Sequence, residues 1–587
     1  MGDTITHRFV DSADGVRIAV YEQGNPDGRA LVMAHGWPDS HVLWDGVVAR
    51  LADRFRIIRF DNRGVGKSSV PEPVSAYTIT KLADDFSAVV DAVSPGEPVH
   101  VLGHDWGSVS IWEYLGRPGA ADRVASFTSV SGPGMAQYGG YIRDSLKRPY
   151  RPVQFVRAVD RLVRLMYWYP FAVPLVAPAV FRLLIRVKGD KVLTDGQPAS
   201  RRYRGDTAAS DLVNALKIYR SLVTSPPLKV ATDRHVSVPV QIIVDTKDPV
   251  VRPHGFDDLS RWVPRLWRRD IKAGHWSPMS HSQVIASAVG ELVDFLEGGP
   301  ASRALLRAQV GRRRGDFGDT LVSVTGAGSG IGRETAMAFA RRGAEVVVSD
   351  IDEAGVKDTA AQIVARGGIA HAYRLDVSDA EAVERFADEV CARHGVPDVV
   401  VNNAGIGQAG AFLDTPADQW HRVLDVNLGG VVNGCKAFGK RLVERGTGGH
   451  IVNVASVAAY LPSQFMNAYC TSKAAVYMFS DCLRAELDAA DIGLTTICPG
   501  VVDTNIVRTT QIAAPNDPTL DVARRHAQVV RFYEKRGYGP DKVAEAIVSA
   551  VKKNKAIRPV TPEAHVAYGL SRVAPPALRR IARRNII

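Results

Sequence analysis

The stretch LVSVTGAGSGIG (321–332) joins an apolar run to a glycine-rich turn, and a helix-like pattern follows it. This order predicts a strand, a tight turn and a helix, the opening unit of a doubly wound parallel sheet. Glycines allow the sharp turn and the close approach of a pyrophosphate, which rests on N–H groups at the start of the helix. A second apolar run ends at Asp350, whose carboxylate would accept from the ribose hydroxyls of NAD and repel a 2′-phosphate. The sequence therefore predicts NAD, with NADP as the poorer cofactor, although Arg333 and Arg341 could offset part of the repulsion.

The whole chain has 587 residues, of which 46% are hydrophobic and 23% charged. Its length predicts at least two cores, and its composition excludes wholesale disorder. Apolar runs of strand length alternate with helix-length segments in both halves, which predicts two α/β domains with parallel sheets. The predicted strands are 30–34, 57–60, 99–103, 124–130 and 240–244, followed by 321–325, 345–349, 398–401, 451–454 and 494–498.

The predicted domains differ in what surrounds their sheets. The first spans 1–297, and a Pro-, Arg- and aromatic-rich insertion of helical character, at about 134–235, is predicted to form a lid. The segment 298–318 is rich in Gly and Arg and lacks a core pattern, which predicts a linker. The second domain spans 319–560, and 561–587 is predicted to be a basic C-terminal tail.

Three residues of the first half follow strands in the order nucleophile, acid, histidine. The strand 99–103 runs into GHDWGS (103–108), where small residues flank Asp105 as a sharp strand-to-helix turn requires. Asp248 follows a later strand, and His275 lies in the loop after the next one. This order predicts a carboxylate nucleophile whose ester is hydrolysed by water that His275, oriented by Asp248, activates.

This half resembles the α/β-hydrolase superfamily, and within it the epoxide hydrolases. The residues that carry the resemblance are HGWPD (35–39), DNRGVGKS (61–68), GHDWGS (103–108), Asp248 and GHW (274–276). The resemblance implies an α/β-hydrolase fold with a helical lid, and an oxyanion hole formed by the backbone N–H groups of Trp37 and Trp106.

The lid contributes the donors that an epoxide needs when its ring opens. YWYPFAVP (167–174) and ALKIYRSL (215–222) resemble the segments that carry the ring-opening tyrosines, which implies Tyr167 and Tyr219, with Tyr169 as the substitute for Tyr167. A phenol of ordinary pKa near 10 stays neutral at pH 7 and can donate to an alkoxide. Two alternatives stay open: a haloalkane dehalogenase that holds halide with tryptophan donors, and a hydrolase fold that only binds a ligand.

The second half carries YCTSK (469–473), which places Tyr469 and Lys473 on one helical face, and Ser456 follows a strand. With NNAG (402–405), Asp376, Asn427 and PGVVDT (499–504), this half resembles the short-chain dehydrogenase/reductases, whose fold is a Rossmann-type doubly wound parallel sheet. The resemblance implies that Tyr469 is the acid/base, that Lys473 lowers its pKa and binds ribose, that Ser456 polarises the carbonyl and that Asn427 supports a proton-relay water. The implied cofactor-binding residues are Gly326, Ser329, Gly330, Ile331, Gly332, Asp350, Asp376, Val377, Asn403, Ala404, Gly405, Tyr469, Lys473, Pro499, Gly500, Val502 and Thr504, and no metal ligands are predicted.

The formal charge of +11 is unevenly distributed. Residues 141–205 carry 14 Lys and Arg against four Asp and Glu, and 303–314 and 566–587 carry five Arg each and no acid. Because no nucleic-acid motif accompanies these stretches, we expect no nucleic-acid partner, and the tail predicts peripheral contact with an anionic membrane. The longest uncharged run, 165–181, is short for a membrane span and is broken by prolines.

The five cysteines all lie in the second half without a CxxC pair, which favours a cytoplasmic protein. Together with the basic tail, this predicts a location at the inner face of the cell membrane. The whole layout resembles actinobacterial fusions of an epoxide hydrolase with a short-chain dehydrogenase, and the dehydrogenase half implies a homo-oligomer. Since epoxide hydrolysis yields a vicinal diol and the dehydrogenase oxidises alcohols, the two reactions are predicted to be sequential. The apolar, proline-rich lid predicts a lipophilic small-molecule substrate.

Overall fold

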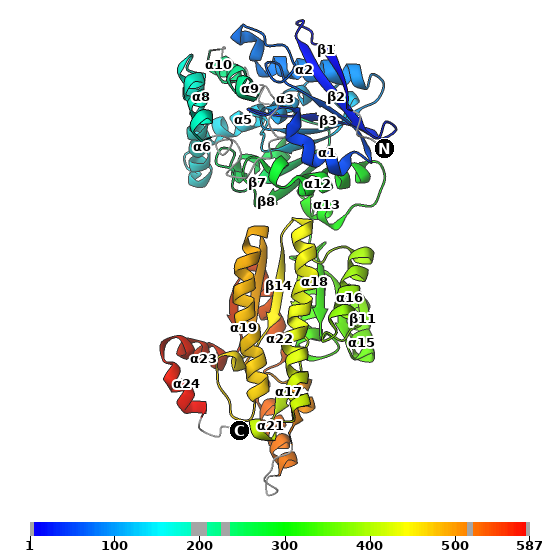
Figure 1. The fold of residues 1–587 in the computed structure, drawn as a ribbon, viewed down its shortest axis with the longest axis vertical. Helices are drawn as coiled ribbons and strands as arrows, with labels where there is room; N and C mark the ends of the chain where they lie inside the picture. Colours follow the sequence, from blue (N-terminus) through cyan, green and yellow to red (C-terminus); the bar gives the residue numbers. More distant parts are fainter. Residues whose placement is uncertain (1–4, 189–207, 225–234, 514–520, 583–587) are drawn as a thin grey trace. The chain divides into compact units, whose positions relative to one another are not determined.

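The computed structural model of the chain describes residues 5–188, 208–224, 235–513 and 521–582. The chain divides into two compact units, unit 1 up to Arg312 and unit 2 from Arg313 (Figure 1). Each unit has its own sheet and its own hydrophobic clusters. The predicted α/β class is confirmed for both units, with a mixed sheet in unit 1 and an all-parallel sheet in unit 2.

The sheet of unit 1 has the strand order β1-β2-β4-β3-β5-β6-β7-β8. Strand β2 is antiparallel to both its neighbours, and the remaining pairs are parallel. The strands are β1 (Thr6–Asp11), β2 (Arg17–Gly24), β3 (Arg29–Ala34), β4 (Phe55–Phe60), β5 (Val99–His104), β6 (Val124–Val130), β7 (Val240–Asp245) and β8 (Leu266–Ile271).

Helices cover both faces of this sheet, which explains the continuous apolar runs of its central strands. Residues of α1 (Asp45–Leu51) and α12 (Ser282–Leu296) pack on one face, and those of α2 (Ile79–Val93) and α3 (Trp106–Leu115) pack on the other. The short helices α4 (Ala120–Arg123) and α11 (Ser277–Ser280) lie in the connections. The loops at the carboxyl ends of β3, β5, β7 and β8 carry Trp37, Asp105, Asp248 and His275, respectively.

Between β6 and β7 the described residues form six helices, which we call the lid. They are α5 (Met135–Leu146), α6 (Pro152–Leu165), α7 (Trp168–Ala172), α8 (Val176–Lys188), α9 (Ala208–Ala215) and α10 (Lys217–Thr224). Residues of α8, α9 and α10 form one cluster with Trp106 and Val109 of α3, so the lid packs directly above the start of α3. Parts of the predicted lid, 189–207 and 225–234, lie outside the described residues.

Unit 2 has seven parallel strands in the order β11-β10-β9-β12-β14-β15-β17. They are β9 (Leu321–Thr325), β10 (Glu345–Asp350), β11 (Ile369–Arg374), β12 (Val399–Asn402), β14 (Gly449–Val454), β15 (Ile492–Cys498) and β17 (Ile557–Pro559). Residues of α14 (Gly330–Ala340), α15 (Glu353–Ala365) and α22 (Pro540–Lys552) pack on one face, and those of α16 (Ala380–His394), α18 (Gly430–Arg445) and α19 (Asn467–Leu487) on the other. Two short strands, β13 (Gln408–Ala409) and β16 (Gln511–Ile512), pair separately, and α17 (Ala417–Leu424), α20 (Asn505–Thr509) and α21 (Val522–Arg536) complete the unit.

The segments 298–318 and 561–587, expected from their composition to be a linker and a basic tail, both contain helices. The predicted linker contains helix α13 (Arg303–Ala308), because Leu305 and Ala308 bury against Trp267 and Leu292 of unit 1. The predicted tail begins with helix α23 (Pro562–Val573), whose Ala564 is buried, and continues with α24 (Pro575–Ala582). In the described part of the chain, no single helix has the length and apolar composition of a membrane span, while Pro152–Ala172 and Val176–Leu184 meet that criterion only as a pair bent by 95°.

Candidate active sites

The predicted nucleophile of unit 1 lies at a strained turn between β5 and α3. Asp105 has φ 49° and ψ −122°, a conformation that L-residues rarely adopt, so its side chain projects from the end of the sheet. A Cβ on Gly36 would lie 2.4 Å from Oδ2 of Asp105, and a Cβ on Gly107 would lie 2.3 Å from the carbonyl oxygen of Ala34. Glycine is therefore required at both positions for the carboxylate to take this place.

The carboxylate of Asp105 meets the donors of the predicted oxyanion hole. The backbone N–H of Trp37 donates to Oδ2 of Asp105 at 2.9 Å, and the backbone N–H of Trp106 also donates to this carboxylate. Burial raises the pKa of Asp105 above its usual value, and the nearby His275 and these two N–H groups oppose that shift. The same donors can stabilise negative charge that develops on this oxygen when Cγ of an ester is attacked.

The predicted acid, Asp248, and the predicted histidine, His275, lie near Asp105 although they follow it by more than 140 residues in the chain. Nδ1 of His275 lies 2.7 Å from Oδ2 of Asp248, and Nε2 of His275 lies 3.9 Å from Oδ1 of Asp105. Backbone N–H groups of Val250 and Val251 donate to Oδ1 of Asp248, which fixes the carboxylate. Burial alone would lower the pKa of His275, but the carboxylates of Asp248, Asp105 and Asp245 together outweigh burial and raise the pKa to about 10. The structure thus brings the three residues together with an imidazolium in the resting site.

The two lid tyrosines lie close enough to the nucleophile for its charge to act on both phenols. Tyr167, at the start of α7, and Tyr219, in α10, have ring centroids 5.8 Å apart, and a side-chain hydrogen bond joins them. Burial raises the pKa of both phenols, and the negative charge of Asp105 adds to that shift. Tyr169, the substitute considered from the sequence, is 62% exposed and does not take this place. Both phenols are therefore neutral donors near Asp105.

Three titratable groups around this site, the buried His104 and Asp245 and the largely buried Asp39, were not assigned from the sequence. Nδ1 of His104 lies 3.9 Å from Oδ2 of Asp39, and Nε1 of Trp276 donates to the same oxygen at 3.2 Å. Burial raises the pKa of Asp39 to about 7 and that of Asp245 to about 8, and it lowers the pKa of His104 to about 3. Asp39 belongs to the motif HGWPD (35–39), which could have pointed to it as a site residue. Asp245 is the last residue of a buried strand, and no motif in the sequence marks it.

In unit 2 the predicted catalytic residues gather at the carboxyl ends of β12, β14 and β15. Tyr469 shares a side-chain hydrogen bond with Ser456, and Nζ of Lys473 lies 5.8 Å from the centroid of the Tyr469 ring. Nζ of Lys473 donates to the carbonyl oxygen of Val454 at 2.9 Å. Burial raises the pKa of Tyr469 to about 12 and lowers that of Lys473 to about 8.

Asn427 lies in a single π-helical turn, Asp425–Gly429, where the regular helical hydrogen bonds are interrupted. Its Oδ1 accepts from the N–H of Ile406 at 2.8 Å, and its Nδ2 donates to the carbonyl oxygen of Ile406 at 3.0 Å. A Cβ on Gly405 would lie 3.1 Å from Oδ1 of Asn427 and 3.4 Å from Nζ of Lys473. Asn427 and Lys473 therefore both border the backbone at Gly405.

The turn TGAGSGIG (325–332) needs glycine, because a Cβ at its glycines would strain the backbone or collide with neighbouring atoms. Gly326 has φ 64° and Gly330 has φ 53°, and a Cβ on Gly332 would lie 2.1 Å from the carbonyl oxygen of Gly326. Ser329 is the N-cap of α14, so the first N–H groups of that helix open onto the turn, as an anionic pyrophosphate requires. At the end of β10, Oδ2 of Asp350 accepts from the N–H of Gly328 at 2.8 Å. The backbone cradle and the carboxylate at its edge fit a dinucleotide with a free ribose 2′-hydroxyl.

Some of the other predicted cofactor residues border the glycine turn, and others are buried in the hydrophobic clusters of unit 2. Asn403 is held by Nδ2 hydrogen bonds to the carbonyl oxygens of Thr325 and Gly326, and a Cβ on Gly330 would lie 3.5 Å from Cβ of Thr504. Val377 and Val502 are buried in hydrophobic clusters, so only their backbone atoms can serve a cofactor. Of the remaining positions, Ile331 and Gly332 lie in α14, and Pro499 and Gly500 follow β15. Oδ1 of Asp376 accepts a hydrogen bond from the N–H of Ser378, and the N–H of Ala404 donates to Oγ1 of Thr325.

One expectation about charge near Asp350 is wrong. Arg341 follows α14 at its far end and pairs with Glu545 at 3.6 Å, so it cannot offset repulsion at the cofactor. Arg333, by contrast, lies in the first turn of α14, where its guanidinium contacts the carbonyl oxygen of Gly328 and Asp358. The two arginines therefore lie at opposite ends of α14, and only Arg333 is at the end that borders the glycine turn.

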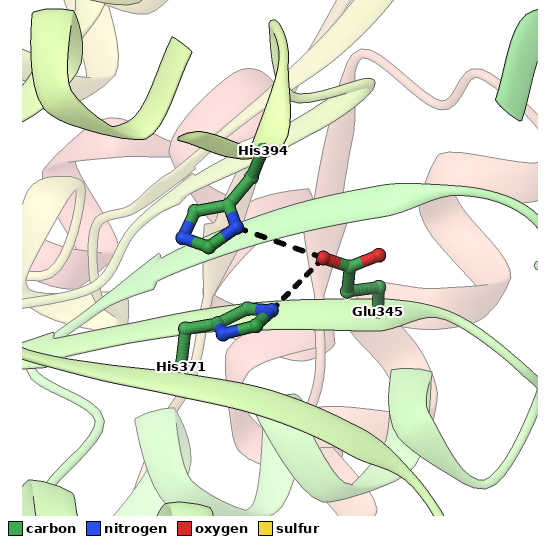
Figure 2. A group of neighbouring side chains, drawn as sticks. All are labelled: Glu345, His371 and His394. Carbon is green, nitrogen blue, oxygen red and sulfur yellow. Dashed lines mark hydrogen bonds and ion pairs between the residues drawn. The ribbon is translucent and has the colours of Figure 1, made fainter. Parts of the chain in front are cut away.

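Among the described residues, one group of side chains has spacing suited to a metal ion: Glu345, His371 and His394 (Figure 2). Oε1 of Glu345 lies 2.9 Å from Nε2 of His371 and 3.8 Å from Nδ1 of His394. The two imidazole rings are stacked, with centroids 3.9 Å apart and 23° between their planes. Because lone pairs in stacked rings run nearly parallel and do not converge on one ion, we interpret this group as a hydrogen-bonded cluster that joins β10, β11 and α16.

Comparisons with known proteins match each half of the chain to a family. The short chain dehydrogenase family matches residues 320–514, and the alpha/beta hydrolase fold family matches residues 29–160. The protein named "Probable oxidoreductase EphD" of Mycobacterium tuberculosis (strain ATCC 25618 / H37Rv) is 64% identical over 586 residues, 99% of each chain. This chain belongs to the EphD family. Like that relative it is an oxidoreductase of the short-chain type fused to an α/β-hydrolase domain.

Two further similarities cover only the dehydrogenase part of this EphD-family protein. The C alpha-dehydrogenase of Sphingobium sp. (strain NBRC 103272 / SYK-6) is 31% identical over 260 residues, 44% of this chain and 85% of the relative. The crystal structure of a short chain dehydrogenase/reductase from Burkholderia phymatum in complex with NAD is 29% identical, covering 43% of this chain and 93% of that chain with a TM-score of 0.41.

Proposed function

We propose that unit 1 hydrolyses a lipophilic epoxide to a vicinal diol through an ester of Asp105. The observation that carries this proposal is the position of Tyr167 and Tyr219, two neutral phenols that face a carboxylate nucleophile. A nucleophilic carboxylate with a His and an Asp behind it fits several ester-forming hydrolases, but paired phenol donors fit a leaving oxygen that stays attached to the substrate.

The proposed reaction has two steps that balance in atoms and charge. An oxygen of Asp105 attacks an epoxide carbon, the carbon–oxygen bond of the ring breaks, and the released oxygen takes a proton from Tyr167 or Tyr219. His275 then takes a proton from water as the water oxygen attacks Cγ of the ester, and the N–H groups of Trp37 and Trp106 stabilise the oxyanion. Collapse breaks the bond between Cγ and the substrate oxygen, which takes the remaining hydroxyl proton of the intermediate and leaves as the diol. Asp105 is left as a carboxylate that holds one oxygen of that water, and solvent returns the proton from His275 to the phenolate.

The charge of Asp105 explains how an imidazolium can become a base. Asp248 and Asp105 both raise the pKa of His275 in the resting site. Ester formation neutralises Asp105 and removes one of these two contributions, so the pKa of His275 falls below about 10 during the half-reaction that needs a neutral imidazole. The rate of ester hydrolysis is therefore expected to rise with pH, because only the deprotonated ring accepts a proton.

The dehalogenase alternative loses one of the donors that supported it. Nε1 of Trp37 already donates to the carbonyl oxygen of Leu212 at 3.0 Å, so this N–H is committed to the lid. A halide leaves as a stable anion and needs no proton, so dehalogenation would not require proton transfer from the two phenols. Turnover of styrene oxide compared with 1-bromobutane separates the two chemistries, and bromide release without epoxide opening would favour the dehalogenase.

For unit 2 we propose NAD-dependent oxidation of a secondary alcohol. NAD, when bound, would accept the hydride, and the glycine turn, Asp350 and Lys473 are the groups that would hold it. Tyr469 would remove the hydroxyl proton, with Ser456 as hydrogen-bond partner at the carbonyl oxygen. Burial keeps Tyr469 protonated in the unliganded site, so the ammonium of Lys473 has to favour the phenolate during turnover.

Asp350 is predicted to set the preference for NAD. Asp350→Ala should lower the ratio of kcat/KM for NAD to that for NADP by about 10- to 100-fold, because it removes a charge that repels the 2′-phosphate. Glu353→Gln, an exposed carboxylate in the next helix, is the matched control and should leave the ratio unchanged. A native preference for NADP would contradict the role given to Asp350.

The fusion leads us to propose that the diol from unit 1 is oxidised by unit 2. A covalent tether raises the local concentration of diol without creating a channel, so only a modest kinetic gain is expected. With a substrate that both units accept, epoxide plus NAD should yield a hydroxyketone and NADH. Asp105→Ala should stop NADH formation from the epoxide and leave it unchanged from the diol. Refusal by unit 2 of every diol that unit 1 makes would end the sequential proposal.

A further inference from the structure

Helix α6 of the lid exposes its apolar face and directs charged side chains toward the rest of unit 1, the reverse of the usual arrangement in a soluble protein. Its charged residues contact the rest of unit 1: Arg161 is buried with its guanidinium 3.6 Å from the ring centroid of Tyr141, and Arg157, although partly exposed, pairs with Asp257 at 2.8 Å. Soluble helices normally bury their apolar stripe and expose the charged one. Here the ionic contacts fix the polar face inward, so the apolar face has to point outward.

That outward face is continuous and apolar. Along α6, exposed apolar side chains recur every three or four positions, at Val153, Val156, Val159, Leu162, Val163 and Met166. Val153 and Val156 are each 64% exposed, far above a core residue. Isolated exposed apolar residues are ordinary, but a contiguous patch on a helix indicates an interaction surface.

The patch continues through the next two helices. After α7 comes Leu175, which is 85% exposed, and α8 repeats the pattern with Val176, Val180, Leu183 and Val187. Helices α6 and α8 lie on the same side of unit 1 in Figure 1. We call this surface, the exposed apolar residues of 153–187, the lid face.

The rim of the lid face is basic. Lys147, Arg148 and Arg151 precede α6 and are exposed, and Arg182 is exposed on α8. In sequence, residues 141–188 contain ten Lys and Arg against two Asp and Glu. An apolar surface with a cationic rim complements a membrane whose headgroups are anionic, because the apolar residues enter the acyl boundary while the cations meet phosphate. A second protein copy would carry the same positive rim and be repelled by it.

We propose that the lid face docks on an anionic lipid surface, with α6 and α8 lying in the plane of the interface. The bend of 95° between these helical segments fits a surface contact better than a span. The opposite side of the same segment carries Tyr167, Phe171 and Phe181, which pack with Trp37 and Tyr219 near Asp105. One short layer of chain therefore separates the lipid surface from the site of unit 1.

The docking proposal is independent of the reaction catalysed, and vesicle sedimentation tests it with the full-length protein. The native chain should bind phosphatidylcholine vesicles that contain phosphatidylglycerol, and binding should weaken with added salt and without the anionic lipid. Val156→Asp with Val163→Asp should lower the partition coefficient by about tenfold or more, because each places a charge in the acyl boundary. Arg148→Glu with Arg151→Glu should also lower it.

Matched controls keep the test specific to the lid face. Val364→Asp changes an exposed valine of α15 in unit 2, and Arg385→Glu changes an exposed arginine of α16, so both should bind vesicles as the native chain does. Because the lid valines are exposed, their variants should keep the native thermal transition and the native NAD-dependent activity of unit 2. That activity and the thermal transition therefore report on folding in every variant.

Three results would overturn the proposal. The first is a native chain that does not bind anionic vesicles. The second is a loss of binding in Arg579→Glu with Arg580→Glu, in helix α24, together with unchanged binding of the lid variants, which would assign the contact to the C-terminal segment. The third is a vesicle-free sedimentation coefficient that falls in the lid variants alone, which would show that a second copy covers the lid face.

Discussion

His275→Gln is expected to accumulate a covalent ester at Asp105 after brief exposure to an epoxide, because alkylation needs the carboxylate and the phenols while ester hydrolysis needs the imidazole. Intact-protein mass spectrometry should show the chain plus one substrate, and peptide mapping should place the adduct on Asp105. Turnover should fall by about 10⁴-fold or more, since members of such a unit fail together.

The controls for this result use the same readout. Asp105→Ala should show no adduct and no turnover, and His235→Gln, an exposed histidine of unit 1, should behave as the native chain does. In H₂¹⁸O, a single turnover of the native chain should place ¹⁸O on Asp105, because the water oxygen stays on Cγ when the ester collapses. An equal adduct in the His275 and Asp105 variants, or ¹⁸O in the first diol released, would refute the ester mechanism.

Tyr469→Phe is expected to reduce alcohol oxidation by about 10³-fold or more while NAD binding changes little, because it removes the proton acceptor without touching the glycine turn. Stopped-flow NADH fluorescence measures the first quantity and calorimetric titration with NAD the second. Tyr373→Phe, whose hydroxyl contacts Nε2 of His394 outside the site, is the matched control. Comparable loss of NAD affinity and of turnover would mean that Tyr469 acts by binding and not by proton transfer.

The native pH dependence of unit 2 should follow the same residue. Since burial holds the pKa of Tyr469 near 12 and only its phenolate accepts a proton, alcohol oxidation should rise as pH increases from neutral. Carbonyl reduction needs the protonated phenol and should fall over the same range. The Phe variant should lose this dependence in both directions.

The short motifs that carry chemistry were predictable because their geometry is local. GHDWGS (103–108) and TGAGSGIG (325–332) specify turns that only small residues permit, and φ angles of 49° at Asp105 and 64° at Gly326 fall inside them. The parallel central strands were equally visible, since burial on both faces demands continuous apolar runs. The predicted strands do not include the edge strands β1, β11 and β17, because an edge strand is partly exposed and carries mixed residues. They also omit β2, which lies between β1 and β4 and is buried only in its middle. The edge strand β8 was expected only as the strand before His275, without bounds.

Tertiary structure alone decided which side of the lid faces inward. Tyr167 and Tyr169 stand two residues apart in one aromatic segment, yet the first is partly buried against Tyr219 and Phe171 while the second is exposed. Likewise, the amphipathic pattern of α6 predicts a helix but not that Arg161 points inward, which its contact with Tyr141 determines. Sequence determined the turns, the central strands and the order of the catalytic residues, because each depends on neighbours along the chain. The partners of each side chain depend on elements far apart in sequence, and only the packing of those elements fixes them.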